Sequence, residues 1–140
     1  HAKLLQEKVR VGTACTAVLI VSIADGWHIN AASPADEALI GTTVDIEKKD
    51  LLDSVSISYP VGIEKQFGYT DFPIEVYEGR VSISLALHVS KKVPPGTYNL
   101  PVRVEYQACS ESVCLAPASA HVVLPLKVVA ASEPVERISR

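Results

Sequence analysis

The sequence of 140 residues contains no methionine, no cluster of basic residues and no long apolar run. Its longest apolar run, residues 17–21, is far shorter than the roughly 20 apolar residues of a membrane-spanning helix. The net charge of -3, without a basic helix, excludes an electrostatic surface for nucleic acid or anionic lipid. No signal peptide stands at the start, so we expect a cytosolic protein or a processed export product.

Helical periodicity is also absent, because no segment of ten or more residues repeats its apolar side chains at helical spacing. Val, Ile and Thr recur instead, and nine prolines and seven glycines separate short alternating stretches. We expect one all-β domain, an antiparallel β-sandwich of residues 1–131 with Trp27 in its core, and a polar tail at 132–140. The predicted strands are residues 9–24, 27–30, 42–46, 54–59, 74–77, 81–89, 97–106 with a break at Pro101, and 120–129.

Cysteine is scarce, but two of the three cysteines, Cys109 and Cys114, are separated by only four residues. A disulfide between them requires a tight turn, and closing so short a loop removes only about 2 kcal/mol of unfolded-chain entropy. A permanent crosslink and a reversible redox pair both fit this spacing. The spacing suits thiol–disulfide exchange better, because one sulfur can leave while its neighbour resolves the mixed disulfide. Cys15 falls on the apolar face of a predicted strand, where a buried, inert thiol is expected.

Aromatic residues are few, yet Phe67, Tyr69 and Phe72 gather in one segment without periodicity. This segment either packs onto the sandwich or forms a lid over a reactive site. Glu111 lies between the two cysteines, where it is either a solvated loop charge or a carboxylate that disfavours the thiolate.

Other chemistry has no support in the sequence. His28, His88 and His121 stand alone, without the paired Cys or His ligands that a four-coordinate zinc site needs, so we expect no metal. There is no glycine-rich phosphate loop and no arrangement of Ser, His and Asp typical of a nucleophilic hydrolase.

Several segments, in order along residues 9–129, resemble the N-terminal periplasmic domain of the DsbD family of thiol:disulfide interchange proteins. They are Gly26-Trp27-His28-Ile29-Asn30, Tyr59-Pro60, Val76-Tyr77-Glu78-Gly79, and the most specific part, Tyr106-Gln107-Ala108-Cys109 with Cys114-Leu115-Ala116-Pro117.

The resemblance implies an immunoglobulin-like sandwich with a redox-active disulfide between Cys109 and Cys114, in which Cys114 forms the mixed disulfide and Cys109 resolves it. It also implies that residues 66–73, which hold Phe67, Tyr69 and Phe72, form a loop that shields the disulfide. Tyr106 and Glu111 are candidates for tuning the pair. Cys15 is extra to the family pattern, and its role stays open.

The function implied is a protein-disulfide reductase domain of a larger inner-membrane enzyme, located in the periplasm. A thioredoxin-like domain of the same protein would donate electrons. Periplasmic thioredoxin-fold proteins, such as disulfide isomerases and cytochrome c maturation factors, would accept them. No cofactor is expected, and no nucleic acid. Contact with the membrane would come only through the remainder of such an enzyme. The alternative is an immunoglobulin-like binding or structural module with a permanent small-loop disulfide.

Overall fold

Two four-stranded sheets form the body of the molecule in the computed structural model, which describes residues 2–4, 8–32, 39–47 and 50–131. The first sheet has the order β1-β3-β9-β6 and is antiparallel throughout. The second has the order β2-β12-β10-β5, in which only β2 runs parallel to its neighbour. The strand bounds are β1 Ala2–Leu4, β2 Val9–Arg10, β3 Ala14–Ser22, β5 Thr43–Ile46, β6 Leu52–Ser58, β9 Arg80–Val89, β10 Gly96–Tyr106 and β12 Ala118–Val129.

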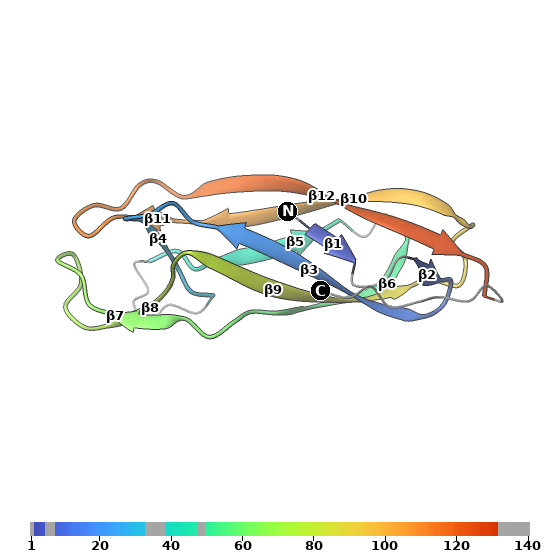
Figure 1. Ribbon diagram of the computed structural model, residues 1–140, viewed down its shortest axis with the longest axis horizontal. Helices are drawn as coiled ribbons and strands as arrows, with labels where there is room; N and C mark the ends of the chain where they lie inside the picture. Colours follow the sequence, from blue (N-terminus) through green and yellow to red (C-terminus); the bar gives the residue numbers. More distant parts are fainter. Residues whose placement is uncertain (1, 5–7, 33–38, 48–49, 132–140) are drawn as a thin grey trace.

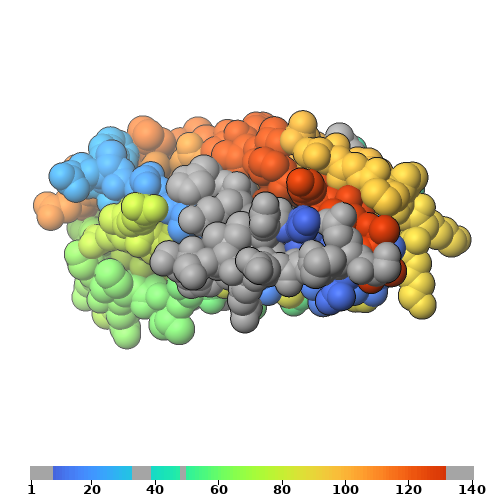
Figure 2. Space-filling model, turned by 45° about the vertical axis from the view of Figure 1, so that its right-hand side comes forward, coloured from blue at the N-terminus to red at the C-terminus, as the bar shows by residue number. Residues whose placement is uncertain are grey.

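A third, smaller sheet lies at one end of the long axis (Figure 1). Its order is β11-β4-β8-β7, and all its pairs are antiparallel. Its strands are short: β4 His28–Asn30, β7 Ile63–Lys65, β8 Ile74–Tyr77 and β11 Ala108–Cys109. The chain segments near residues 25, 70 and 113 therefore gather at the same end, as the light-blue, green and orange atoms of Figure 2 show.

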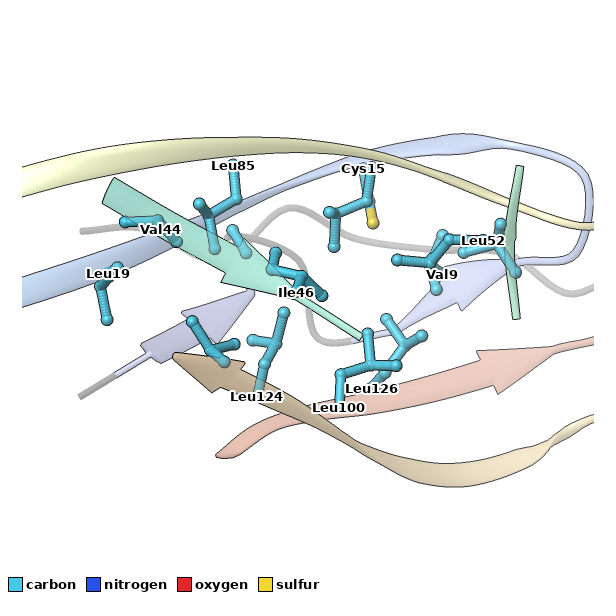
Figure 3. Close-up of a cluster of buried hydrophobic side chains, with 14 of the residues drawn as sticks. Val9, Cys15, Leu19, Val44, Ile46, Leu52, Leu85, Leu100, Leu124 and Leu126 are labelled. Atoms are coloured by element: carbon cyan, nitrogen blue, oxygen red, sulfur yellow. The ribbon is translucent and has the colours of Figure 1, made fainter. Parts of the chain in front are cut away.

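The core lies between the two larger sheets and is built from alternating strand positions (Figure 3). In β9, Ile83, Leu85, Leu87 and Val89 are buried while Ser82 and Ala86 face solvent, as the alternating pattern predicts. Leu100, Leu124 and Leu126 of the opposing sheet are fully buried against them. The part of the chain that the structure describes contains no helix, and the predicted all-β, immunoglobulin-like sandwich is confirmed. None of its elements is a helix long and apolar enough to cross a membrane.

The single strand predicted for residues 9–24 is wrong, because the chain turns at Gly12. Gly12 has φ 71°, a conformation that favours glycine, and a Cβ there would lie 2.7 Å from the Lys91 side chain. The turn moves the chain between sheets: Val9 pairs with Val128 in one sheet, and Cys15 pairs with Leu87 in the other.

The predicted break at Pro101 is also wrong, because β10 continues through it from Gly96 to Tyr106. In an antiparallel strand, the nitrogen and the carbonyl of one residue point to the same side. The Pro101 carbonyl accepts a hydrogen bond from the Glu47 amide, just beyond the last β5 residue. The missing proline N–H therefore faces Glu47, just beyond the end of β5, so the sheet lacks a bond only at the margin of an edge strand.

The remaining differences concern the small sheet. No strand was predicted between residues 59 and 74, but Ile63–Lys65 forms β7 and pairs with β8. Trp27, expected in the core, is only half-buried and precedes β4. Tyr77 secures this end instead: it is 2% exposed, and its hydroxyl donates to the Pro60 carbonyl over 2.8 Å. The tail expected at 132–140 lies outside the described residues.

Candidate functional site

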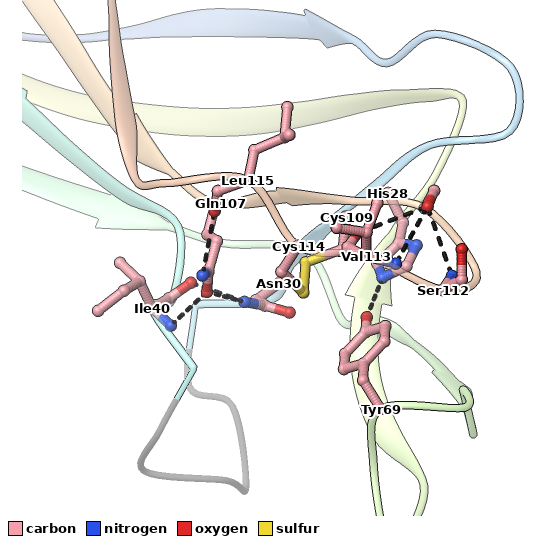
Figure 4. Close-up of a disulfide and its surroundings, with 11 residues drawn as sticks. His28, Asn30, Ile40, Tyr69, Gln107, Cys109, Ser112, Val113, Cys114 and Leu115 are labelled. Carbon is pink, nitrogen blue, oxygen red and sulfur yellow. Dashed lines mark hydrogen bonds between the residues drawn. A yellow bond between two sulfur atoms is a disulfide. The ribbon is translucent and has the colours of Figure 1, made fainter.

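A short hairpin, residues 108–115, carries the two neighbouring cysteines (Figure 4). Cys109 and Cys114 form a disulfide with an S–S distance of 2.16 Å and a Cα–Cα distance of 4.0 Å. Main-chain bonds close the hairpin on both sides of the disulfide: the Ser110 amide donates to Val113 O over 2.8 Å, and the Leu115 amide donates to Ala108 O over 2.9 Å. We call residues 108–115 the cysteine hairpin.

The two sulfurs lie in different surroundings. Cys109 is 0% exposed, because it is in β11 and pairs with His28 of β4 on one side and with Cys114 on the other. Cys114 is partly exposed, and its neighbours Val113 and Leu115 are 51% and 50% exposed. Of the two cysteines, Cys114 is therefore the one with exposed surface, and it lies between two exposed apolar side chains.

The amide of Gln107 holds the base of the cysteine hairpin in place (Figure 4). Its Oε1 accepts hydrogen bonds from Asn30 Nδ2 over 3.2 Å and from the Ile40 amide over 3.1 Å. Its Nε2 donates to the carbonyl of Leu115 over 3.3 Å. One side chain thus ties β4, the segment before β5 and the residue after Cys114 together. Asn30 is 0% exposed, and it also donates to Ile40 O over 2.9 Å.

Residues 66–73, the aromatic loop, turn back toward the cysteine hairpin. Thr70 fixes the turn, because its hydroxyl both accepts from the Phe67 amide and donates to the Phe67 carbonyl, each over 3.1 Å. A Cβ atom added at Gly68 would lie 3.8 Å from the main-chain oxygen of Glu111, which belongs to the cysteine hairpin. The loop and the hairpin therefore lie side by side.

Two of the three aromatic residues of the loop stack on a histidine. The rings of Phe67 and His28 lie 4.1 Å apart between centroids at 14°, and those of Phe67 and Tyr69 lie 5.4 Å apart at 8°. The Tyr69 hydroxyl and His28 Nε2 are 2.5 Å apart in a hydrogen bond whose donor depends on the imidazole tautomer. Phe72 is 44% exposed.

Burial shifts the pKa values of the stacked groups. The pKa of His28 is lowered, first because burial disfavours the imidazolium, and then by the positive charge of Lys65, while Glu78 opposes the shift. Lys65 and Glu78 form an ion pair over 2.8 Å. Burial raises the pKa of the Tyr69 phenol. Both rings are therefore neutral near pH 7.

The two candidate tuning residues lie in different surroundings. Tyr106 is half-buried and packs against the main core and against the smaller apolar cluster of Ile29, Ala31 and Tyr77. Glu111 is exposed and helps to line a polar groove of about 880 Å³ beside the ring stack. The same groove is lined by Trp27, His28, Lys65 and Phe67.

Cys15 is not part of this site. It is 5% exposed within the main core, as the sequence predicted, and is the free cysteine of the chain. Burial raises the pKa of its thiol to about 11. No group of three or more metal-ligating side chains occurs in the part of the chain that the structure describes.

Three residues of the site escaped the sequence reasoning. His28 appeared in the sequence as an isolated histidine and within the segment Gly26-Trp27-His28-Ile29-Asn30, but its pairing with Cys109 depends on which strands become neighbours. Thr70 and Gln107 act through loop and main-chain hydrogen bonds that have no periodic signal. For Gln107, the sole hint was its place in the segment Tyr106-Gln107-Ala108-Cys109.

Comparison with known proteins gives this geometry a context. The family described as "Thiol:disulfide interchange protein DsbD, N-terminal" matches residues 2–126. The chain belongs to this family. The match includes both cysteines of the hairpin, the aromatic loop and His28. Membership in the DsbD N-terminal family supports thiol–disulfide exchange as the chemistry of this domain.

Solved structures add evidence about the fold. The N-terminal periplasmic domain of ScsB from Proteus mirabilis is similar, with a TM-score of 0.57 and 17% identity over 90% of this chain and 45% of that one. This chain thus spans less than half of the ScsB domain structure. A family 123 glycoside hydrolase from Clostridium perfringens has a TM-score of only 0.38 at 14% identity, over 90% of this chain and 22% of that one, which is too low to indicate a shared fold. No curated protein sequence matches the chain.

Proposed function

We propose that this domain relays electrons in the periplasm, from a thioredoxin-like reductant domain of the same protein to disulfide-bonded partner proteins. The observation that carries the proposal is the unequal exposure of a local disulfide: Cys109 is 0% exposed and Cys114 is partly exposed. Exchange requires one sulfur that a partner can reach and a second within bonding distance of the first. The cysteine hairpin supplies both.

The proposed reaction begins with the reduced pair. The Cys114 thiolate attacks one sulfur of a partner disulfide, forming a mixed disulfide and releasing the partner's other sulfur as a thiolate, which takes up a proton. The Cys109 thiolate then attacks Cys114 Sγ and releases the partner's second thiol. Two electrons have passed to the partner, and the Cys109–Cys114 disulfide has formed. The upstream thioredoxin-like domain reverses this sequence with its own dithiol.

Among acceptors, we propose periplasmic thioredoxin-fold proteins, including disulfide isomerases and factors of cytochrome c maturation. The domain would act as the protein-disulfide reductase unit of a larger membrane enzyme. The aromatic loop, through Phe67, Tyr69 and Phe72, would shield the disulfide between encounters, and Tyr106 and Glu111 would tune it. Of the three aromatic residues, Phe67 and Tyr69 are favoured as the shield because they face His28, the strand partner of Cys109.

Trapping of mixed disulfides tests the proposal. Cys109→Ser should accumulate a mixed disulfide with an oxidised thioredoxin-fold protein, because Cys114 can attack but nothing resolves the product. Cys114→Ser is the matched variant and should accumulate little, because Cys109 is buried. Trapping by Cys114→Ser alone would reverse the roles of the two cysteines. If neither variant traps a partner, and the reduction potential of the wild-type disulfide lies below roughly -300 mV, the pair is a permanent crosslink.

A further inference from the structure

We propose that His28 is a positioning residue that keeps the aromatic loop closed against the cysteine hairpin while its imidazole is neutral, and releases the loop when the imidazole is protonated. This inference rests on the proposed function, because a closed loop matters only if the disulfide must be reached. It assigns a role to a residue that is neither a cysteine nor a member of the loop.

The backbone of His28 is fixed relative to the disulfide. β4 pairs with β11, so that His28 lies directly opposite Cys109, and β4 pairs with β8 on its other side. The residue is buried, with 2% of its surface exposed. His28 is thus a rigid point on the sandwich side of the site, from which a contact to the aromatic loop can hold that loop in place (Figure 4).

Two contacts join this rigid point to the loop. Phe67 stacks on the imidazole at 4.1 Å, and the Tyr69 hydroxyl shares a hydrogen bond with Nε2. Thr70 locks the turn that presents both rings, so the loop approaches or leaves His28 as a unit. The other side of the turn, at Gly68, faces the Glu111 carbonyl of the cysteine hairpin. If the rings left His28, the loop would therefore move away from the hairpin as well.

The pH dependence of loop closure comes from the titration of His28 itself and not from the charged groups around it. Glu78 and Lys65 act on it with opposite signs and are paired with each other. Asp25 and Glu111 line the same groove from the turn before β4 and from the cysteine hairpin. Tyr69 has a raised phenol pKa and stays neutral wherever histidine titrates. Cys109 does not titrate while the disulfide is intact.

The sign follows from proton linkage. Burial in the closed arrangement lowers the pKa of His28, and opening the loop restores it toward the ordinary value of 6.5. The open form therefore binds the proton more tightly. The free energy that favours the closed loop is fully present above the ordinary pKa of histidine. It is lost as the pH falls from the pKa of His28 in the open arrangement through its pKa in the closed arrangement. Acid exposes the disulfide.

The test measures how fast a small phosphine reduces the oxidised domain, from about pH 8 to about pH 5.5, a range that spans the ordinary histidine pKa. Rates are expressed as wild type over variant at each pH, so that the titration of the phosphine cancels. For His28→Gln, which is polar but does not titrate, this ratio should rise as the pH falls. Tyr69→Phe should be reduced about fivefold faster than wild type at about pH 8, the change expected for loss of one hydrogen bond of ordinary net strength.

Matched controls lie far from the site. His121→Gln removes an exposed histidine of β12, and Tyr98→Phe removes a hydroxyl that donates to Pro94 O over 2.6 Å. Both should be reduced at the wild-type rate at every pH. Because His28 is buried, Tyr69→Phe keeps the proposal testable if His28→Gln does not fold.

A wild-type rate for Tyr69→Phe, or a constant ratio for His28→Gln, overturns the proposal, since a merely structural histidine would change the rate equally at all pH values. Mixed-disulfide trapping by Cys109→Ser is measured in parallel. If mixed disulfides are trapped but the rate ratio does not change with pH, His28 does not have this role and the proposed function still holds. A ratio that rises in acid without any trapping keeps the role of His28 in loop closure and removes the electron relay.

Discussion

Cys109 and Cys114 share one disulfide but not one environment: β4 and the hairpin cover Cys109 completely, while Cys114 reaches the surface. The difference arises from the fold and not from the local sequence. Cys109 is in β11, where it lies between His28 of β4 and Cys114, whereas Cys114 only bridges back to Cys109 from the returning arm of the hairpin. We therefore expect the two sulfurs to react in a fixed order, with Cys114 first.

Alkylation of the reduced domain should follow that order. At neutral pH an iodoacetamide pulse should label Cys114 first and Cys109 at least about tenfold more slowly, because only the exposed thiol presents a reactive thiolate. Cys15 should remain unlabelled until unfolding, since burial raises its pKa to about 11. Mass spectrometry of the three peptides measures the rates, and denatured protein, in which all three should react alike, is the control. Faster labelling of Cys109 would contradict the assignment.

Gln107→Ala should destabilise the domain and loosen the hairpin base. The substitution removes three hydrogen bonds, to Asn30, Ile40 and Leu115. At about 1 kcal/mol each, the loss is about 2–3 kcal/mol of unfolding free energy, measured by urea denaturation. Asn99→Ala, at an exposed position of β10, is the matched amide deletion and should change stability by less than about 0.5 kcal/mol. Equal effects of the two would mean that the Gln107 network contributes nothing.

Thr70→Val should loosen the aromatic loop while the sandwich stays intact. The variant keeps the shape of the side chain but loses the hydroxyl that both donates to and accepts from Phe67. We expect the Phe67 amide to exchange with solvent about tenfold faster, which corresponds to about 1.4 kcal/mol of local protection. Thr97→Val, at an exposed position of β10, should leave exchange at Phe67 unchanged. Unaltered exchange in Thr70→Val would show that the turn is held by other contacts.

The strands with clean alternation could be predicted from sequence, because burial on one sheet face imposes a period of two. β9 illustrates this, with Ile83, Leu85, Leu87 and Val89 inside. The failures occurred where the outcome depends on a neighbouring strand. Gly12 ends one strand because the chain changes sheets there, and Pro101 is tolerated because β5 stops beside it. Neither fact is local to the sequence around the residue.

The site divides in the same way. The paired cysteines and the aromatic loop were recognised from residue type and spacing, and the disulfide itself is present. His28 was not recognised, because its contacts with Phe67 and Tyr69 join β4 to a loop about forty residues further along the chain. Which aromatic residues of the loop face inward was equally beyond the sequence, since the loop lacks the periodicity that assigns faces to strand residues.

Cys15 offers a prediction about alkaline stability. Burial raises the pKa of its thiol from 9.0 to about 11, so the folded chain holds this proton more tightly than the unfolded chain does. The resulting stabilisation is fully present below the unfolded value, and is lost as the pH rises through the folded value. A shift of this size corresponds to at most about 3 kcal/mol.

Cys15→Val keeps the apolar volume and removes the titration. Between about pH 7.5 and about pH 10.5, the unfolding free energy of the wild type should fall by about 2 kcal/mol relative to that of the variant. The reason is that the unfolded wild-type chain releases the Cys15 proton in this range, whereas the variant has no such proton. Both chains carry Cys109→Ser and Cys114→Ser, so that no disulfide can exchange with the freed thiolate. Ala14→Val, an exposed neighbour, should show no such pH dependence. A stability difference between wild type and Cys15→Val that is constant with pH would mean that the Cys15 thiol ionises as readily in the folded chain as in the unfolded one.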